Sequence, residues 1–218
     1  MKITKYPQSA ILIEYKNKRI LIDPGSYCYN ENFSPNDWGK IDILLITHTH
    51  KDHCLPEAIK IIEQNNPTLF IFSNKEVKEK LLSKGIECEI INPGEEKRVD
   101  DLKILGIKSV HGDLPPDASS TIKPEVIGFL IDDKFYHPGD TVYLEEKPKA
   151  EILFVPICGM VVMGPKKAAC FSKEINPKLT IPIHYDSPKF PVDVNEFAKE
   201  MKGYNIRILK NGESIEID

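Results

Sequence analysis

The chain has 218 residues, of which 41% are hydrophobic and 28% are charged, and its formal net charge is −4. These values are typical of a soluble globular protein that is large enough to bury a sizeable core. No apolar run approaches the roughly 20 residues that a membrane span needs, and no Lys/Arg-rich block indicates a nucleic-acid-binding surface.

The cysteines indicate neither cross-links nor a zinc finger. Their number is five, their spacings are wide, and no Cys-x-x-Cys pair occurs. Free thiols fit a reducing compartment, and residues 1–19 contain no apolar region followed by a small-residue cleavage site. We therefore expect a cytoplasmic protein.

The first half of the chain begins with predicted strands at 10–15 and 19–22, which flank a polar turn. Residues 23–40 are rich in Pro, Gly, Asn and Ser but carry four aromatic residues, which indicates a packed functional loop. Strands are then expected at 41–46 and 68–72, and helices at 55–65 and 76–84.

The second half contains more strands. Apolar runs predict strands at 87–91, 97–99, 102–110, 151–155 and 179–183, and helices at 165–175 and 194–202. Residues 126–131 and 134–136 predict a hairpin that turns at Asp132-Asp133. Residues 206–209 and 214–217 predict another around Asn211-Gly212. Two sheets packed face to face with helices outside would satisfy this burial pattern. No linker divides the chain, so we expect one domain over residues 1–218.

A dense group of metal-binding side chains follows the strand predicted at 41–46. His48, His50, Asp52 and His53 place three imidazoles and one carboxylate within six residues. At the end of a strand the backbone leaves the sheet, so side chains at several phases can converge on one point. Imidazole and carboxylate together suit zinc and similar divalent ions.

Three further ionisable residues have the same placement at the end of an apolar run. His111 follows 102–110, Asp140 follows the segment FYHPG, and His184 follows 179–183. Ligands in layered α/β folds bind beyond the carboxyl ends of strands. The sequence therefore predicts one site that collects these residues together with the 48–53 segment.

The succession H-x-H-x-D-H, a lone His, Gly-Asp-Thr and a late His resembles the metallo-β-lactamase superfamily. The similarity extends from LIDP at 21–24 to His184. The segments FYHPGDT, VPICGMVVMGP and IPIHY look most like the small stand-alone metal-dependent hydrolases related to ascorbate-6-phosphate lactonase. The resemblance implies an α+β fold, a four-layer αββα sandwich of two mixed sheets with helices outside. In that branch a His precedes the Ser of the first strand, whereas this chain has Gln8.

The resemblance also implies a binuclear metal centre with seven ligands. One ion would be held by His48, His50 and His111, the other by Asp52, His53 and His184, and both by the bridging Asp140. Two such ions lie about 3.5–4 Å apart and share a hydroxide that acts as the nucleophile. Asp52 and Asp140 would be the catalytic carboxylates. Zinc is the expected metal, and manganese also suits imidazole and carboxylate ligands.

Three other residues have two interpretations each. Asp23 either orients a metal ligand or is a turn residue before Pro24. His137 either donates a proton to a leaving group or supports the turn before Asp140. Cys54 either approaches the metals or packs inward at the start of the next helix.

The predicted function is hydrolysis of a lactone, another ester or a phosphodiester in a small molecule. An RNA-processing nuclease of the same superfamily is the main alternative, but it would need a basic surface that a charge of −4 does not suggest. A di-iron redox protein is a third interpretation, although such relatives usually carry Glu where this chain has His50. A non-enzymatic binding module is the fourth, but such proteins usually lose ligands, and all seven are kept here.

The expected partner is a small-molecule substrate, with no membrane and no nucleic acid, and a homo-oligomer is compatible with the sequence. Loops 23–40 and 112–124 would shape the pocket. The second loop contains Pro115-Pro116 and a Ser/Thr run, which makes it a candidate for a mobile lid. The substrate itself is not named by the sequence, because this fold hosts many chemistries.

Overall fold

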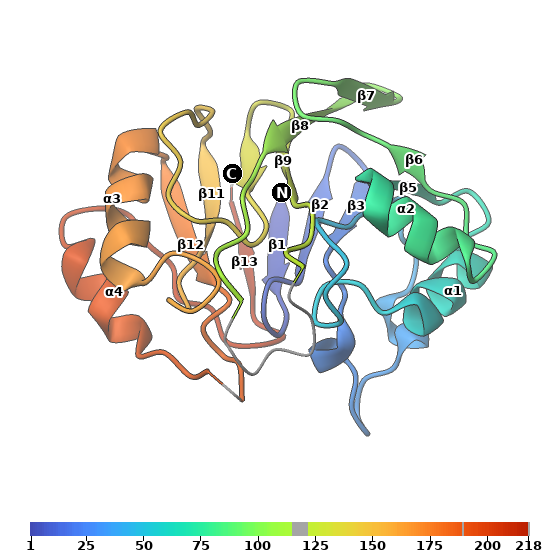
Figure 1. The fold of residues 1–218 in the computed structure, drawn as a ribbon, viewed down its shortest axis with the longest axis horizontal. Helices are drawn as coiled ribbons and strands as arrows, with labels where there is room; N and C mark the ends of the chain where they lie inside the picture. Colours follow the sequence, from blue (N-terminus) through green and yellow to red (C-terminus); the bar gives the residue numbers. More distant parts are fainter. Residues whose placement is uncertain (115–121, 189, 218) are drawn as a thin grey trace. The chain divides into compact units, whose positions relative to one another are not determined.

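The computed structural model describes residues 1–114, 122–188 and 190–217, and the chain divides into two compact units. Unit 1 comprises Met1–Ile91 and Leu209–Asp218, and unit 2 comprises Asn92–Ile208. Within the described residues, each unit contains one β-sheet and two α-helices (Figure 1). The single domain expected over residues 1–218 stays a prediction.

The sheet of unit 1 is mixed and has the strand order β13-β1-β2-β3-β4-β5-β6. Neighbours from β13 to β3 are antiparallel, whereas β3, β4, β5 and β6 run parallel. The carboxyl ends of β3, β4 and β5 therefore lie side by side at one edge. The strands are β1 (Lys2–Lys5), β2 (Ile11–Tyr15), β3 (Lys18–Ile22), β4 (Ile43–Leu45), β5 (Phe70–Ser73), β6 (Glu89–Ile90) and β13 (Ser214–Glu216).

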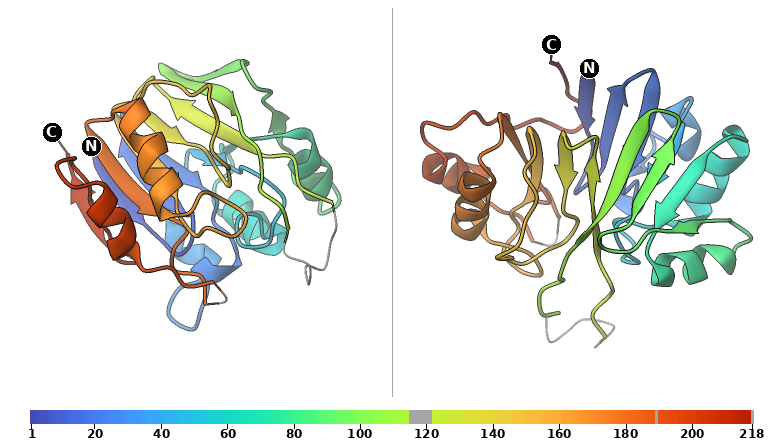
Figure 2. Two further views of the ribbon diagram at one scale, coloured as in Figure 1. Left: turned by 60° about the vertical axis from the view of Figure 1, so that its left-hand side comes forward. Right: turned by 90° about the horizontal axis from the view of Figure 1, so that it is seen from above.

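Helices α1 (Pro56–Asn65) and α2 (Lys75–Leu82) lie along one face of this sheet (Figure 2). Helix α1 begins with a proline, whose missing N–H is one that the first turn leaves unbonded in any case. It buries Ile59 and Ile62 in a cluster that also contains Leu44 and Leu81. Full burial of such an aliphatic side chain contributes about 1.5–3 kcal/mol, so this cluster is what fixes the helices on the sheet.

The aromatic loop between β3 and β4 is packed, as expected. It contains two short 3-10 turns, η1 (Ser26–Cys28) and η2 (Pro35–Trp38). Trp38 is 2% exposed, and its ring centroid lies 4.5 Å from that of Tyr6 and 4.8 Å from that of Phe33. Its indole Nε1 donates a hydrogen bond to the Tyr29 hydroxyl at 3.2 Å. The loop thus extends the core of unit 1.

The sheet of unit 2 is also mixed and has the strand order β12-β11-β10-β9-β8-β7. Strand β9 is antiparallel to both β8 and β10, whereas β10, β11 and β12 are parallel. Strands β8, β10 and β12 therefore end at the same edge. The strands are β7 (Glu96–Val99), β8 (Leu102–Lys108), β9 (Ile127–Ile131), β10 (Phe135–His137), β11 (Ile152–Pro156) and β12 (Leu179–Ile183).

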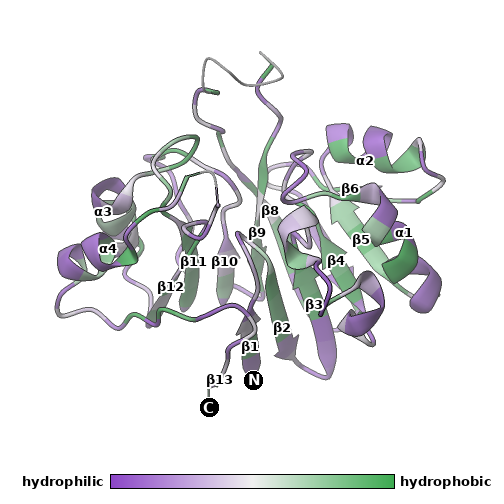
Figure 3. Cartoon of the chain, turned by 90° about the horizontal axis from the view of Figure 1, so that it is seen from below, coloured by the Kyte–Doolittle hydropathy of each residue, from purple (hydrophilic) through white to green (hydrophobic). Residues whose placement is uncertain are grey.

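Helices α3 (Pro165–Ile175) and α4 (Val194–Glu200) bury apolar residues against this second sheet. Phe171 and Phe197 are fully buried there together with Leu153 and Val155 of β11. Figure 3 shows the resulting pattern, with apolar strands and helices that are polar on one side. None of the helices in the described part of the chain combines the length and hydropathy that a membrane span requires.

The predicted C-terminal hairpin is wrong, whereas the hairpin at Asp132-Asp133 is confirmed, with φ of 51° and 52° at its turn. Strand β13 pairs antiparallel with β1, which the sequence reading missed, and Ile206 forms an isolated parallel bridge with Thr180. The Asn-Gly turn was recognised correctly, but a turn motif does not say which strand the chain joins next.

The predicted lid, loop 112–124, falls largely on residues 115–121, which lie outside the described residues.

Candidate metal centre

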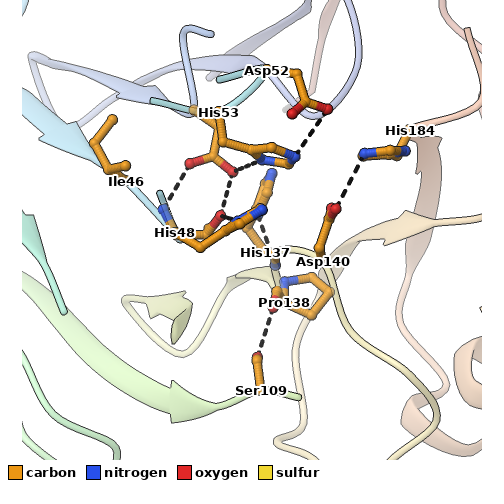
Figure 4. A network of polar contacts seen from close by, with 12 residues as sticks. Ile46, His48, Asp52, His53, Ser109, His137, Pro138, Asp140 and His184 are labelled. Atoms are coloured by element: carbon orange, nitrogen blue, oxygen red, sulfur yellow. Dashed lines mark hydrogen bonds and ion pairs between the residues drawn. The ribbon is translucent and has the colours of Figure 1, made fainter. Parts of the chain in front are cut away.

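The histidine-rich loop of unit 1, residues 47–54, connects β4 to α1 and brings three imidazoles together. The ring centroids of His48 and His53 are 4.1 Å apart, and those of His48 and His50 are 4.7 Å apart. Asp52 Oδ2 lies 3.6 Å from His53 Nε2, a contact drawn in Figure 4. The turn is closed by the backbone N–H groups of His53 and Cys54, which both donate to the His50 carbonyl. The four ligands predicted in this segment thus form one cluster.

Asp23 holds this cluster from the end of the neighbouring strand β3. Its carboxylate accepts hydrogen bonds from the Thr47 backbone N–H and hydroxyl, both at 2.7 Å, and from His53 Nδ1 at 2.8 Å. Asp23 is fully buried and has a φ of 49°, a left-handed conformation that Asp adopts more readily than most residues. Of the two interpretations of Asp23, the structure supports the one in which its side chain orients another residue, here His53, which is one of the predicted ligands.

The network around Asp23 also fixes which ring nitrogens carry protons. Because a carboxylate can only accept, His53 donates from Nδ1 and keeps the Nε2 lone pair for a metal ion. The Thr47 hydroxyl gives its single proton to Asp23, so its oxygen accepts from His48 Nδ1 at 3.0 Å. Two histidines are therefore set in the Nδ1–H tautomer by one carboxylate.

Gly25 allows the chain after β3 to pass directly against this loop. A Cβ at Gly25 would lie 1.9 Å from the carbonyl carbon and oxygen of Asp52 and 2.4 Å from the His53 nitrogen. The Ser26 backbone N–H donates to the Lys51 carbonyl at 2.9 Å. The close approach of two backbones is thus part of how the loop is held.

In unit 2, Asp140 lies between two histidines. Its Oδ2 is 3.3 Å from His184 Nε2, as drawn in Figure 4, and 4.0 Å from His111 Nε2. The three side chains follow β12, β10 and β8, whose common direction brings them to one edge of the sheet. Each of these residues is at most 5% exposed. The three ligands predicted in this half of the chain are thus also brought together.

Local backbone contacts orient this second cluster. His111 Nδ1 lies 2.8 Å from the Gly112 carbonyl and donates to it, which leaves Nε2 toward Asp140. His184 has a φ of 55°, and a non-glycine residue in this conformation costs about 1–3 kcal/mol, which the surrounding fold must offset. Such strain is common at functional sites.

Thr141 is a residue that sequence reasoning missed. Its hydroxyl accepts from the Val110 backbone N–H at 3.3 Å, and the Val142 N–H donates to the Val110 carbonyl at 2.8 Å. These two bonds join the segment that carries Asp140 to the segment that carries His111. The only signal in the sequence was the Thr of Gly-Asp-Thr. A search for metal-binding side chains does not select this threonine.

For His137 and Cys54 the structure favours a structural role. His137 is fully buried, and its Nδ1 accepts a hydrogen bond from the Gly139 N–H at 3.2 Å within the turn before Asp140. Cys54 packs in the core of unit 1, and burial raises the pKa of its thiol to about 12. The thiolate that binds metals is therefore strongly disfavoured at this position.

The donor chemistry of both clusters fits a divalent cation. The unit 1 cluster offers three imidazoles and a carboxylate. The unit 2 cluster offers two imidazoles and a carboxylate. Zinc and related ions are bound by this combination of ring nitrogens and carboxylate oxygens. The seven side chains are therefore candidate metal-binding groups.

Comparison with known proteins identifies the family. A family model described as a beta-lactamase superfamily domain matches residues 2–184. The chain belongs to the beta-lactamase superfamily. Within this superfamily it is 31% identical to the UPF0173 metal-dependent hydrolase MJ1163 of Methanocaldococcus jannaschii, over 81% of this chain and 83% of the relative. It is 29% identical to a UPF0173 metal-dependent hydrolase of Anoxybacillus flavithermus, over the full length of both.

A solved structure has the same fold. Igni18, a metallo hydrolase from Ignicoccus hospitalis, is 26% identical and aligns with a TM-score of 0.78 over 100% of this chain and 99% of its own. The predicted fold class, the α+β metallo-β-lactamase fold with two mixed sheets, is confirmed. Together with the relatives above, this identifies a metal-dependent hydrolase of the superfamily.

Proposed function

We propose that this hydrolase uses two zinc ions to cleave a lactone or another ester in a small molecule. In this proposal His48, His50 and His111 would hold one ion, Asp52, His53 and His184 would hold the other, and Asp140 would bind both. The observation that carries the proposal is the complete set of seven metal-binding side chains in a chain of this family. Two zinc ions would lower the pKa of water toward about 7 and polarise the carbonyl to be attacked.

The two carboxylates of the proposed centre are suited to different roles. Asp140 is 1% exposed and lies between two imidazoles, which supports assigning to it the role of bridging the ions. The Asp52 side chain is 25% exposed and can meet water and substrate. We assign to the Asp52 carboxylate the role of orienting the attacking water and accepting its proton.

Exposed apolar side chains favour a neutral ester over a phosphodiester. Val110, Met160 and Phe190 are 39%, 47% and 37% exposed, although large apolar side chains are usually buried. Val110 directly precedes His111, and Met160 neighbours Val161, whose carbonyl accepts from the Gly112 N–H. Phe190 follows His184 by six residues, in a segment closed by an Asp186–Pro191 bridge. These side chains would contact an apolar part of the substrate.

The arginines of the chain also favour an ester substrate over a phosphodiester. Arginine is the side chain best suited to bidentate binding of a phosphate. The three arginines of this chain are Arg19, Arg98 and Arg207, and none of them belongs to a segment that carries a proposed metal ligand. A phosphodiester substrate, such as RNA, would therefore not be bound by an arginine in these segments.

The proposal is tested by metal analysis and a substrate panel. Zinc- and manganese-loaded protein is assayed with a lactone, a 4-nitrophenyl ester, bis(4-nitrophenyl) phosphate and a tRNA precursor. We expect about two zinc ions per chain and turnover of the first two substrates. His50→Ala should lose metal and activity together, whereas Lys51→Ala, an exposed neighbour in the same loop, should keep both. Full activity in a metal-free His50→Ala protein would refute the mechanism.

A further inference from the structure

Helix α2 contacts the histidine-rich loop through residues at both of its ends. Just before the helix, the hydroxyl of Ser73, the last residue of β5, donates at 2.5 Å to the carbonyl of Ile46, the residue that precedes the loop. The N-cap residue Asn74 donates from Nδ2 to the Thr47 carbonyl at 3.3 Å while it accepts from the Val77 N–H. These contacts hold the point at which the chain leaves β4.

The last turn of α2 makes a second, charged contact with the same loop. The ammonium group of Lys80 donates to the Thr49 carbonyl at 2.5 Å and to the Cys54 carbonyl at 3.2 Å. These two carbonyls lie on either side of the turn that carries His50, Asp52 and His53. A single ammonium group therefore joins the two ends of the ligand-bearing turn.

Such a link has a direct effect on ligand geometry. A bonded Thr49 carbonyl fixes the peptide plane that leads into His50. A bonded Cys54 carbonyl fixes the peptide plane between Cys54 and Leu55, one residue beyond His53. Hydrogen bonds from a charged donor are roughly twice as strong as neutral ones. Lys80 is half-buried, so these bonds are partly shielded from competition by water.

We propose that Lys80 is a positioning residue for the metal ligands of unit 1. It touches neither substrate nor metal but sets the directions from which His50 and His53 present their ring nitrogens. The inference rests on the proposed function, because it requires that these histidines bind metal. It adds to that function a supporting residue from a helix that lies outside the superfamily motif.

The test measures zinc affinity rather than activity. Lys80→Met and Lys80→Gln keep a stem of similar length but remove the ammonium group. Zinc affinity is measured by competition with a chromophoric chelator, and coordination geometry by the visible spectrum of the cobalt-substituted protein. Loss of a residue that orients metal ligands typically lowers affinity about 10–100-fold, and we expect a loss in this range. Lys80→Arg, which keeps a charged donor, should recover most of the affinity.

Lys60 provides a matched control. Its ammonium group also donates to a backbone carbonyl, that of Gly85, at 2.8 Å, but outside the ligand loop. Lys60→Met should therefore change zinc affinity less than about twofold. A folded Lys80→Met or Lys80→Gln protein with wild-type affinity and cobalt spectrum would overturn the inference, as would an equal loss in Lys60→Met. Wild-type protein that binds no zinc would instead remove the proposed function, and the inference with it.

Discussion

Asp23 Oδ2 lies 2.8 Å from His53 Nδ1, and both side chains are fully buried. The two residues are 30 positions apart in the chain and are brought together because β3 and β4 are parallel neighbours. The carboxylate would therefore act on the proposed metal centre through an imidazole rather than as a ligand. It selects the tautomer in which Nε2 can bind metal.

Replacement of Asp23 by Asn should weaken metal binding. The amide is nearly the same size but has no charge and only one acceptor oxygen for three donors. We expect zinc affinity to fall about 10–100-fold, measured by chelator competition. Asp42→Asn is the control, because Asp42 is also buried and accepts from the Arg19 backbone N–H, but lies away from the ligand loop. Unchanged affinity in Asp23→Asn would contradict the assigned role.

Thr47→Val should show that Thr47 and Asp23 act as a unit. Valine keeps the shape of threonine but removes the hydroxyl that connects His48 to the carboxylate. We expect a smaller loss of zinc affinity than for Asp23→Asn. We also expect the double variant to lose less than the sum of the two single losses. Coupling of about 0.5 kcal/mol or more in this double-mutant cycle would support the network, whereas strict additivity would argue against it.

How far the sequence predicted this site depends on the kind of residue. The seven candidate ligands stand out in the sequence because they belong to a pattern of ionisable residues that follows predicted strands, and their role as ligands stays a prediction. The residues that hold them were harder to find, because a threonine before a histidine or a lysine on a helix is unremarkable until tertiary contacts are known. Lys80 is 26 residues from Cys54, and no local pattern connects them.

The fold shows the same limit. Strands and helices were placed well where periodicity was clear, as in α1 and α3, but the partner of β13 was misjudged. Its pairing with β1 joins residues more than 200 positions apart, and Thr4 Oγ1 lies 2.8 Å from Ser214 Oγ across this pair. Local turn chemistry contains no information about such a distant partner.

Gly25→Ala should destabilise the protein. The new Cβ would meet the Asp52 backbone at 1.9 Å, and backbone atoms cannot swing aside as a side chain can. Overpacking of this kind costs about 3 kcal/mol, which should appear as a lower midpoint of urea unfolding. At Gly164 the nearest atom to an added Cβ is 3.6 Å away, so Gly164→Ala should cost less than about 1 kcal/mol. Equal stability of the two variants would contradict the close packing.

The thiols should differ sharply in reactivity. Cys170 is exposed, whereas Cys88 is buried, and burial raises the pKa of its thiol to about 12. At pH 8 we expect one fast-reacting thiol per native chain with a disulfide reagent, and none in Cys170→Ser. Fast labelling of several thiols in the native protein would contradict the packing.

The stability of the protein should also depend on pH through Cys88. Because the pKa of Cys88 is raised above the value of about 8.5 in an unfolded chain, its contribution to stability is complete below pH ~8.5 and lost as the pH rises toward 12.

Met160→Ser should reduce a preference for apolar substrates. If the exposed Met160 contacts the acyl part of an ester, each additional methylene should contribute at most about 0.8 kcal/mol, or about fourfold in kcat/KM. We therefore expect 4-nitrophenyl butyrate to be a better substrate than the acetate, and Met160→Ser to bring the two closer together. Leu82→Ser, a change at an equally exposed apolar residue at the end of α2, should leave the ratio unchanged. Because the acetate reports the chemical step in every variant, a lower butyrate-to-acetate ratio at constant acetate turnover would assign Met160 to substrate binding. An unchanged ratio would place the acyl group elsewhere.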